Sequence, residues 1–187
     1  MNIYFLSSNE NKINEVKSIL DSEIITILPV KEKINEIQSN DMNKIAIDKA
    51  LKAFKSIGRP ILVEQTGLLL KDLGGLPGGL TQIFWDSLEA DNFSKYFSAT
   101  ETGQVTAKTV IAYCDGKQIQ TFEGEIKGSV VTHPRGNRDF QWDCIFQPDN
   151  YEQTFAEMGE MKNSISMRKI ALEKLRNFLE EHLCSKN

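Results

Sequence analysis

Cysteine is scarce in this sequence and lacks the spacing that metal or disulfide chemistry uses. The three cysteines, Cys114, Cys144 and Cys184, lie far apart, with no Cys-x-x-Cys pair. The sequence therefore predicts neither a zinc site nor a disulfide framework. This usage fits a reducing compartment, and we expect a cytoplasmic protein.

The chain also lacks a long apolar run and an excess of positive charge. The run Ile3–Leu6 turns polar at once, which is too short for a signal peptide or a membrane span. The formal net charge of -4 argues against binding to nucleic acid polymers or anionic membranes, so a phosphate ligand would need a local cluster of cations. No internal repeat is present. The 187 residues are enough for one compact unit, which we expect to span residues 1–187.

In the central stretch 61–70, the run of branched apolar residues between Pro60 and Gly67 predicts a strand buried on both faces. We expect it to carry Glu64, Gln65 and Thr66 at its carboxyl end, where open α/β sheets keep their ligand sites. Glycines crowd residues 74–79, so the backbone there turns sharply or lies close against another group. A metal and phosphate site is one interpretation. An ordinary strand and tight turn that carry a glutamate are the other.

The first strand, Ile3–Leu6, leads into a helix with a polar start. Ser8 or Asn9 is the expected N-cap. The unpaired N–H groups of a helix start, the hydroxyl of Ser7 and the ammonium of Lys12 are suited to bind an anion. A plain capped helix with a surface lysine is the alternative.

The order of the remaining elements predicts the fold. Strands are expected at 24–30, near an edge of the sheet, and at 106–114 and 117–127 around an Asp-Gly turn, with another at 128–132. Helices are expected at 43–57 and 83–97, with Asp91 capping a second piece of the latter. The prediction is an α/β fold: a mixed, strongly twisted central sheet flanked by helices, with two lobes around a central cleft.

A polar loop at 133–143 mixes arginines, carboxylates and aromatic residues. Phe140 and Trp142 are able to stack on a flat base, and the Asp143 carboxylate would accept hydrogen bonds from the N–H groups at the edge of that base. The alternative is that these aromatic residues belong to a strand that faces the core. The polar stretch 31–41, which contains Glu36, is typical of a solvated loop.

The final stretch, 162–183, predicts a long amphipathic helix. Extending its apolar stripe backwards places Met167 and Arg168 on the buried side near the start of the helix. A buried arginine is unfavourable without a partner, so a protein carboxylate or an anionic ligand is expected beside Arg168.

These stretches resemble the inosine triphosphate pyrophosphatase family, whose members hydrolyse non-standard purine nucleoside triphosphates to the monophosphate and pyrophosphate. The resemblance extends over nearly the whole chain. Its motifs are Ser7-x-Asn9-x-x-Lys12, Leu62-Val63-Glu64-Gln65-Thr66, Leu73-Gly74-Gly75-Leu76-Pro77-Gly78, Pro134-Arg135-Gly136, Asp139-Phe140-Gln141-Trp142-Asp143, Phe146-Gln147-Pro148-Asp149, Tyr151 to Met158, and Lys162-Asn163 through Ser166-Met167-Arg168.

The resemblance implies a role for each matched position. The triphosphate and the base would contact Ser7, Asn9, Lys12, Thr66, Phe140, Trp142, Asp143, Lys162 and Arg168. Glu36 and Glu64 would bind Mg²⁺, and the catalytic positions would be Lys12, Glu64 and Gln65. The implied reaction is attack of a magnesium-activated water on the phosphoryl group at the α–β linkage. A homodimer is also implied, and Leu80–Tyr96 is a candidate apolar dimer face.

Several positions depart from the family pattern. Gln65 stands where the family has an acid, and an amide cannot take a proton at neutral pH. Gln82 replaces a basic residue, Gln141 a glycine and Met167 a histidine. One interpretation is an active pyrophosphatase with altered substrate preference, in which Glu64, Glu36 or another nearby acid such as Asp72 does the work of the missing carboxylate. The others are an impaired member that binds a nucleotide as a sensor or partner protein, and a plain interaction module.

Overall fold

A six-stranded sheet forms the centre of the computed structural model, which describes residues 1–98, 100 and 102–184 and side chains as far as His182. The side chain of Cys184 therefore lies outside the described part. The strand order is β2-β1-β3-β4-β5-β6. The strands are β1 (Asn2–Leu6), β2 (Thr26–Val30), β3 (Ile61–Leu70), β4 (Gln104–Cys114), β5 (Ile119–Val130) and β6 (Phe146–Pro148).

The sheet is mixed, as the sequence predicts. β1 runs parallel to β2 and β3, whereas β3, β4, β5 and β6 pair antiparallel in that order. Pro29 lies in the edge strand β2, where a missing N–H costs no ladder bond. The β4–β5 hairpin turns at Asp115, whose carboxylate accepts the N–H groups of Lys117 and Gln118, both at 2.9 Å. Gly116 supplies the positive φ of 86° that this turn needs.

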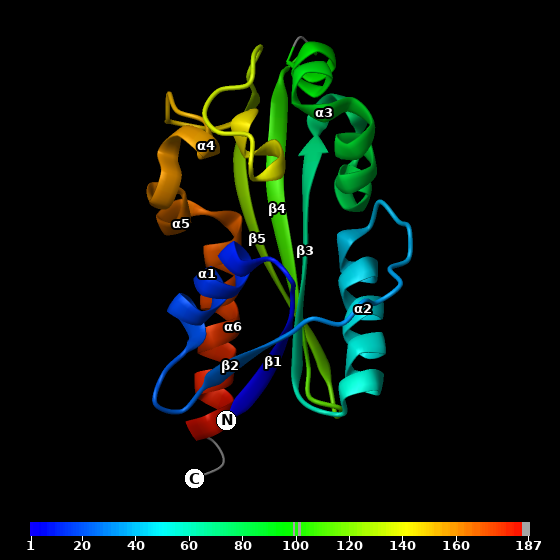
Figure 1. Ribbon diagram of the computed structural model, residues 1–187, viewed down its shortest axis with the longest axis vertical. Helices are drawn as coiled ribbons and strands as arrows, with labels where there is room; N and C mark the ends of the chain where they lie inside the picture. The colour runs from blue at the N-terminus through cyan, green and yellow to red at the C-terminus, as the bar shows by residue number, and fades with distance from the viewer. Residues whose placement is uncertain (99, 101, 185–187) are drawn as a thin grey trace.

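Helices cover both faces of the sheet (Figure 1). The α-helices are α1 (Glu10–Leu20), α2 (Met42–Ile57), α3 (Thr81–Phe97), α4 (Phe155–Met158), α5 (Lys162–Ile165) and α6 (Met167–Cys184). Short 3-10 turns are η1 (Lys71–Leu73), η2 (Gly78–Leu80), η3 (Gln141–Cys144) and η4 (Gly159–Met161). Among the described residues, none of these helices is both long and apolar enough to cross a membrane.

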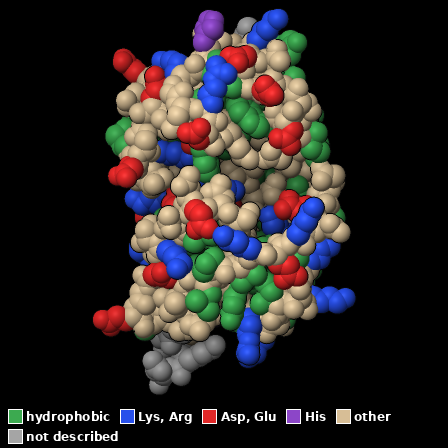
Figure 2. Space-filling view, viewed as in Figure 1, with side chains coloured by type: hydrophobic (Ala, Val, Ile, Leu, Met, Phe, Trp, Pro, Cys, Tyr) green, Lys and Arg blue, Asp and Glu red, His purple; other side chains and the backbone are tan. Residues whose placement is uncertain are grey.

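Three hydrophobic clusters place the helices. α1 and α6 share one cluster with β1, α2 shares a second with β3 and β4, and α3 and α4 share a third with the far ends of β3, β4 and β5. The long strands thus run through two lobes, with α1, α2 and α6 in one and α3, α4 and α5 in the other (Figure 1). The surface is hollowed between the lobes, with charged side chains around the hollow (Figure 2).

Two strands run longer than the sequence predicts. β3 continues through Gly67 to Leu70, paired with β4 along its whole length, so Glu64 lies inside the strand and not at its end. β1, however, pairs with β3 only as far as Leu62, and Glu64 therefore lies just beyond the carboxyl end of β1. The strand expected at 128–132 is also not separate, because its first residues continue β5.

Two helices are interrupted where the sequence predicts continuity or a cap. The final helix breaks at Ser166, whose extended backbone separates α5 from α6. α3 breaks at Glu89, which has a φ of 54°, while Asp91 pairs with Arg138 instead of capping the second half. Within Leu80–Tyr96, the candidate dimer face, Phe93 is fully buried, and Phe84 and Trp85 pack partly buried against the same hydrophobic cluster.

Candidate active site

A pocket of about 590 Å³ opens between the two lobes, at the carboxyl end of β1. Ser7, Ser8, Asn9 and Lys12 line it from the start of α1, and residues 139–141 line it from the opposite lobe. Its charged residues are evenly divided: Lys12, Lys31, Lys33 and Lys49 against Glu32, Glu36, Glu64 and Asp139. The local structure at α1 follows the sequence, since the Asn9 side chain accepts the Lys12 N–H at 3.1 Å and is the N-cap.

Glu64 forms the floor of this pocket and is almost fully buried. Its carboxylate accepts hydrogen bonds from Arg168 at 2.7 and 3.0 Å and from the Thr66 hydroxyl at 2.8 Å, and Lys12 pairs with it at 2.9 Å. Burial alone would raise the pKa of Glu64, but the charges and hydrogen bonds of Arg168 and Lys12 outweigh it and hold the pKa well below the ordinary value. Glu64 is therefore a carboxylate at neutral pH.

Arg168 owes its position to a second acid, Glu15 of α1. Their contact is 2.5 Å, and Ser166 donates to the other Glu15 oxygen at 3.0 Å. Arg168 is only 1% exposed, and its ion pairs are with the protein carboxylates of Glu15 and Glu64. Of the two partners that the sequence left open, a protein carboxylate or an anionic ligand, the structure therefore shows the first.

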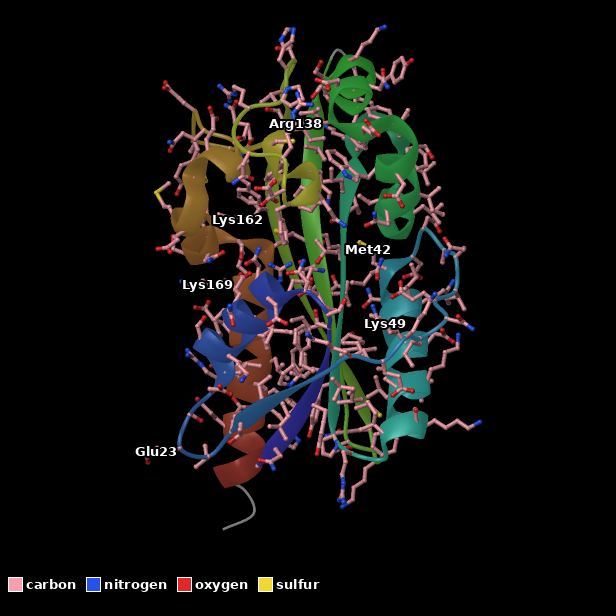
Figure 3. All side chains as sticks on the ribbon, in the orientation of Figure 1. Glu23, Met42, Lys49, Arg138, Lys162 and Lys169 are labelled. Atoms are coloured by element: carbon pink, nitrogen blue, oxygen red, sulfur yellow. The ribbon has the colours of Figure 1, made fainter. Side chains whose placement is uncertain are left out.

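Lys49 of α2 brings a further cation to the pocket wall. Its ammonium contacts Glu36 at 2.5 Å and the Glu64 carbonyl oxygen at 3.4 Å, and its side chain is only 15% exposed. Figure 3 shows Lys49 extending from α2 toward the centre of the molecule. Glu36 thus lines the pocket from the 31–41 loop, as a partly exposed carboxylate.

Phe140 separates this pocket from a second one of about 510 Å³, because it lines both. The ammonium of Lys162 lies 4.2 Å from the centre of the Phe140 ring and also binds Asp143. Burial raises the pKa of Asp143 and lowers that of Lys162, since both are less than 10% exposed. Among the described residues, Asp143 is one of a few with a buried side-chain oxygen that lacks a hydrogen-bond partner.

Some predicted site residues lie behind the pocket walls. Gln65 is on the opposite face of β3 from Glu64, where its amide reaches the Gly79 carbonyl oxygen at 3.5 Å. Thr66 supports Glu64 from within the sheet and also contacts Thr109 at 2.9 Å. Trp142 is 3% exposed and packs edge-on against Phe146, so it faces the core, but from the 3-10 turn η3 and not from the strand that the sequence analysis offered as the alternative.

The glycine-rich loop does not line either pocket. A Cβ on Gly78 would come within 2.6 Å of the Asn40 carbonyl oxygen, and one on Gly79 within 2.4 Å of that of Ser39. The close approach that the glycines predict is therefore to the protein's own backbone and not to a phosphate. Asp72, the substitute acid considered from the sequence, binds the N–H and hydroxyl of Thr102 at 2.9 and 2.8 Å and lines neither pocket.

A comparison with known families decides the relationship. The model of the Ham1 family matches residues 3–178. This chain belongs to the Ham1 family. It is 38% identical over 184 residues to an inosine triphosphate pyrophosphatase of Yarrowia lipolytica, with 97% of each chain covered. It is 32% identical over 188 residues to a dITP/XTP pyrophosphatase of Methanopyrus kandleri, with each covered fully.

Solved structures agree with this assignment. A HAM1 protein from Coxiella burnetii superposes with a TM-score of 0.84 at 28% identity, covering 97% of this chain and 99% of that one. The α/β fold with a mixed sheet is therefore confirmed, as is the family that the sequence motifs predict.

Two of the departures from the family pattern meet in the structure of this Ham1 chain. Gln141 donates from its side-chain amide to that of Gln82, and Gln82 in turn donates to Asp86 at 2.6 Å. Met167 is 1% exposed and belongs to the hydrophobic cluster around α3 and α4.

Proposed function

We propose that this chain hydrolyses non-standard purine nucleoside triphosphates to the monophosphate and pyrophosphate. The observation that carries the proposal is the pair of pockets that meet at Phe140, one with lysines and a helix start, the other with a buried, unpaired carboxylate oxygen. The names of the full-length relatives support the same substrate class. Residues 1–187 would act as one unit, since both lobes contribute to the pocket.

The phosphates would lie in the first pocket. There the start of α1, with Ser7 and Asn9, faces the same space as Lys12 and Lys49. The free N–H groups at a helix start and the ammonium groups of lysines both donate hydrogen bonds to phosphate oxygens and stabilise their negative charge. Because Lys12 and Lys49 are already paired with Glu64 and Glu36, a triphosphate would have to compete with these carboxylates for the two ammonium groups.

The base would lie in the second pocket and stack on Phe140. One Asp143 oxygen, Oδ2, pairs with the Lys162 ammonium, and the other, Oδ1, has no partner. Oδ1 would therefore accept a hydrogen bond from an N–H group at the edge of the base. A 6-oxo purine presents N–H at ring position 1, whereas adenine presents a bare nitrogen there. Arg168 lines this second pocket together with Asp143 and Lys162, while the buried Trp142 would support its wall from behind.

A divalent cation, Mg²⁺, is part of the proposal. Mg²⁺ is usually held by one or two carboxylates together with substrate phosphates, and the pocket offers Glu36 and Glu64. Among the described residues no cluster of three or more acidic, histidine or cysteine ligands forms a self-contained metal site, which fits a cation that arrives with the substrate. When bound, it would neutralise phosphate charge and acidify a water.

Two further properties complete the proposal. We infer a homodimer, for which α3 offers exposed apolar side chains, Ile83 at 48% and Tyr96 at 55% exposed. We also infer a cytoplasmic, reducing location, because Cys114 and Cys144 are free, buried thiols.

Binding is tested by thermal denaturation with a panel of nucleoside triphosphates, each with and without Mg²⁺. Inosine triphosphate at about 100 times its dissociation constant should stabilise the protein by about 2.7 kcal/mol, and the K12A variant should lose this effect. The matched control is Lys117→Ala, in the β4–β5 turn away from both pockets. A shift that survives K12A unchanged would place the nucleotide elsewhere.

A second candidate function is nucleotide binding without efficient turnover, and Gln65 is the observation that favours it. An amide cannot act as a general base, and its 3.5 Å contact with Gly79 is too long to fix it firmly. We expect Gln65→Asp to raise pyrophosphate release at least about tenfold. Gln65 lies on the opposite face of β3 from Glu64 and lines neither pocket, so an unchanged rate would show that position 65 takes no part in proton transfer and that a residue lining the pocket does this work.

A further inference from the structure

We propose that Gln82 and Asp91 of α3 are positioning residues that hold the Phe140 segment in place between the two pockets. We call the two contacts between this segment and α3 the clamp. The existence of the clamp rests on the geometry alone, and its effect on the substrate rests on the proposed function. The segment 138–141 is joined to α3 at both of its ends, and Phe140 lies between the two joints.

The first joint is the pair of Arg138 and Asp91. The guanidinium donates two hydrogen bonds to the carboxylate, at 2.7 and 3.0 Å. A bidentate pair fixes orientation as well as distance, unlike most exposed ion pairs. The hydrogen bonds and charge of Arg138 lower the pKa of Asp91, so the pair stays ionised at neutral pH. Figure 3 shows Arg138 close to the upper part of α3.

The second joint is the amide contact between Gln141 and Gln82. Gln82 is itself oriented by its bond to Asp86 one turn further along α3. The two joints lie on opposite sides of the break at Glu89, so each half of α3 holds one end of the segment.

The backbone shows why the segment needs these joints. Gln141 has a φ of 42°, a left-handed conformation that is strained for any residue with a Cβ. Such a conformation persists only where the surroundings hold it. Phe140 immediately precedes it, and the ring must stay against Lys162 to form a wall of both pockets. Loosening either joint would therefore release the aromatic wall while leaving Lys12 and Glu64, on the opposite side of the first pocket, untouched.

The test combines hydrogen exchange of the ligand-free protein with steady-state kinetics. The variants are Q82A, D91N and the double variant, with Glu180→Gln on the exposed side of α6 as the control. In the double variant the backbone N–H of Asp143, which donates to the Phe140 carbonyl, should exchange at least about tenfold faster. KM for inosine triphosphate should rise about three- to tenfold while kcat changes less than twofold.

A swapped pair, D91R with R138D, should return the exchange rate and KM from the D91N values toward those of the parent protein, because the ion pair forms again with its charges exchanged. Unchanged exchange in the double variant would overturn the clamp, as would faster exchange with an unchanged KM. If the parent protein neither binds nor hydrolyses any nucleoside triphosphate, the proposed function fails and the exchange data alone decide whether the clamp exists.

Discussion

At the scale of single residues, the pocket depends on a chain of charges, of which all but Lys12 are buried. Lys12, Glu64, Arg168 and Glu15 contact one another in that order, and Ser166 completes the chain. Buried charges are tolerated only where every member has partners. Glu15 acts on Glu64 through Arg168, because it fixes the guanidinium that orients the Glu64 carboxylate.

Replacing Glu15 with glutamine should destabilise the protein by about 1.5–3 kcal/mol, the range for a hydrogen bond to a charged group. The physical reason is that Arg168 would keep Glu64 but lose its second carboxylate. Urea denaturation measures this loss. The control, Glu180→Gln, breaks only an exposed pair with Arg176 at 3.9 Å and should change stability by no more than about 0.5 kcal/mol. Equal effects of the two substitutions would contradict the network.

The lowered pKa of Glu64 predicts an acid-sensitive fold. A carboxyl whose pKa is lower in the folded state stabilises the protein above its unfolded pKa, near 4.5, and this stability is lost as pH falls toward the folded value. Below about pH 4.5 the free energy of unfolding should therefore fall more steeply for the parent than for the E64Q variant, by up to about 1.4 kcal/mol per pH unit. Denaturation curves of both proteins at several pH values measure this difference. If the free energy of unfolding falls with pH equally for the parent and E64Q, the prediction is wrong.

The residue-scale predictions from sequence succeeded where a charge interrupts an apolar stripe. That reasoning placed Arg168 on a buried face, and the same reasoning was available for Lys49, which lies four residues from both Ile45 and Ala53 on α2. Glu15 lies three residues after Lys12, on a helix that was predicted. The partner of each charge was not predictable, because it comes from a distant part of the chain.

At the scale of elements, the close approach of β5 and α6 sets the position of Arg168. A Cβ on Gly124 would come within 1.9 Å of the Met167 carbonyl oxygen and 2.9 Å of the Ala171 N–H nitrogen. No side chain fits between the strand and the first turn of the helix, so glycine is required there for space.

Gly124→Ala should therefore cost about 3 kcal/mol or more, since the strand and helix must move apart. Gly58→Ala is the matched control: it has no atom within 4 Å of the new Cβ, and only its φ of 67° is strained, which costs about 1–2 kcal/mol. Thermal denaturation of both variants gives the comparison. A smaller loss for Gly124→Ala than for Gly58→Ala would mean that the contact is not close in solution.

Element boundaries were less predictable than element types. The apolar run of β3 continues through Gly67, because β3 pairs with β4 along its whole length on both sides of this glycine. Ser166 and Met167 look like ordinary helix residues in the sequence. The backbone of Ser166 is nevertheless extended, because its hydroxyl donates a hydrogen bond to Glu15 and accepts one from the N–H of Lys169. Tertiary contacts override local preference at these places.

At the scale of the whole molecule, the long strands β3, β4 and β5 carry both lobes, so the pocket between them forms when the sheet does (Figure 1). The mixed α/β fold was predictable from the order of strands and helices. The location of the pocket was predictable in part, from the carboxyl end of β1 and from the polar loop around Phe140. The two-pocket arrangement was not, since it depends on how the loop at 133–143 packs against α4 and meets the Lys162 side chain of α5.

The central claim is that the two pockets joined at Phe140 select and hydrolyse a non-standard purine nucleoside triphosphate. Its most direct test is pyrophosphate release from inosine triphosphate and from adenosine triphosphate by the purified parent protein in the presence of Mg²⁺. We predict one pyrophosphate per inosine monophosphate formed and a kcat/KM at least about a hundredfold higher for inosine triphosphate, because Asp143 requires an N–H from the base. Equal values for the two nucleotides, or no pyrophosphate from either, would contradict it.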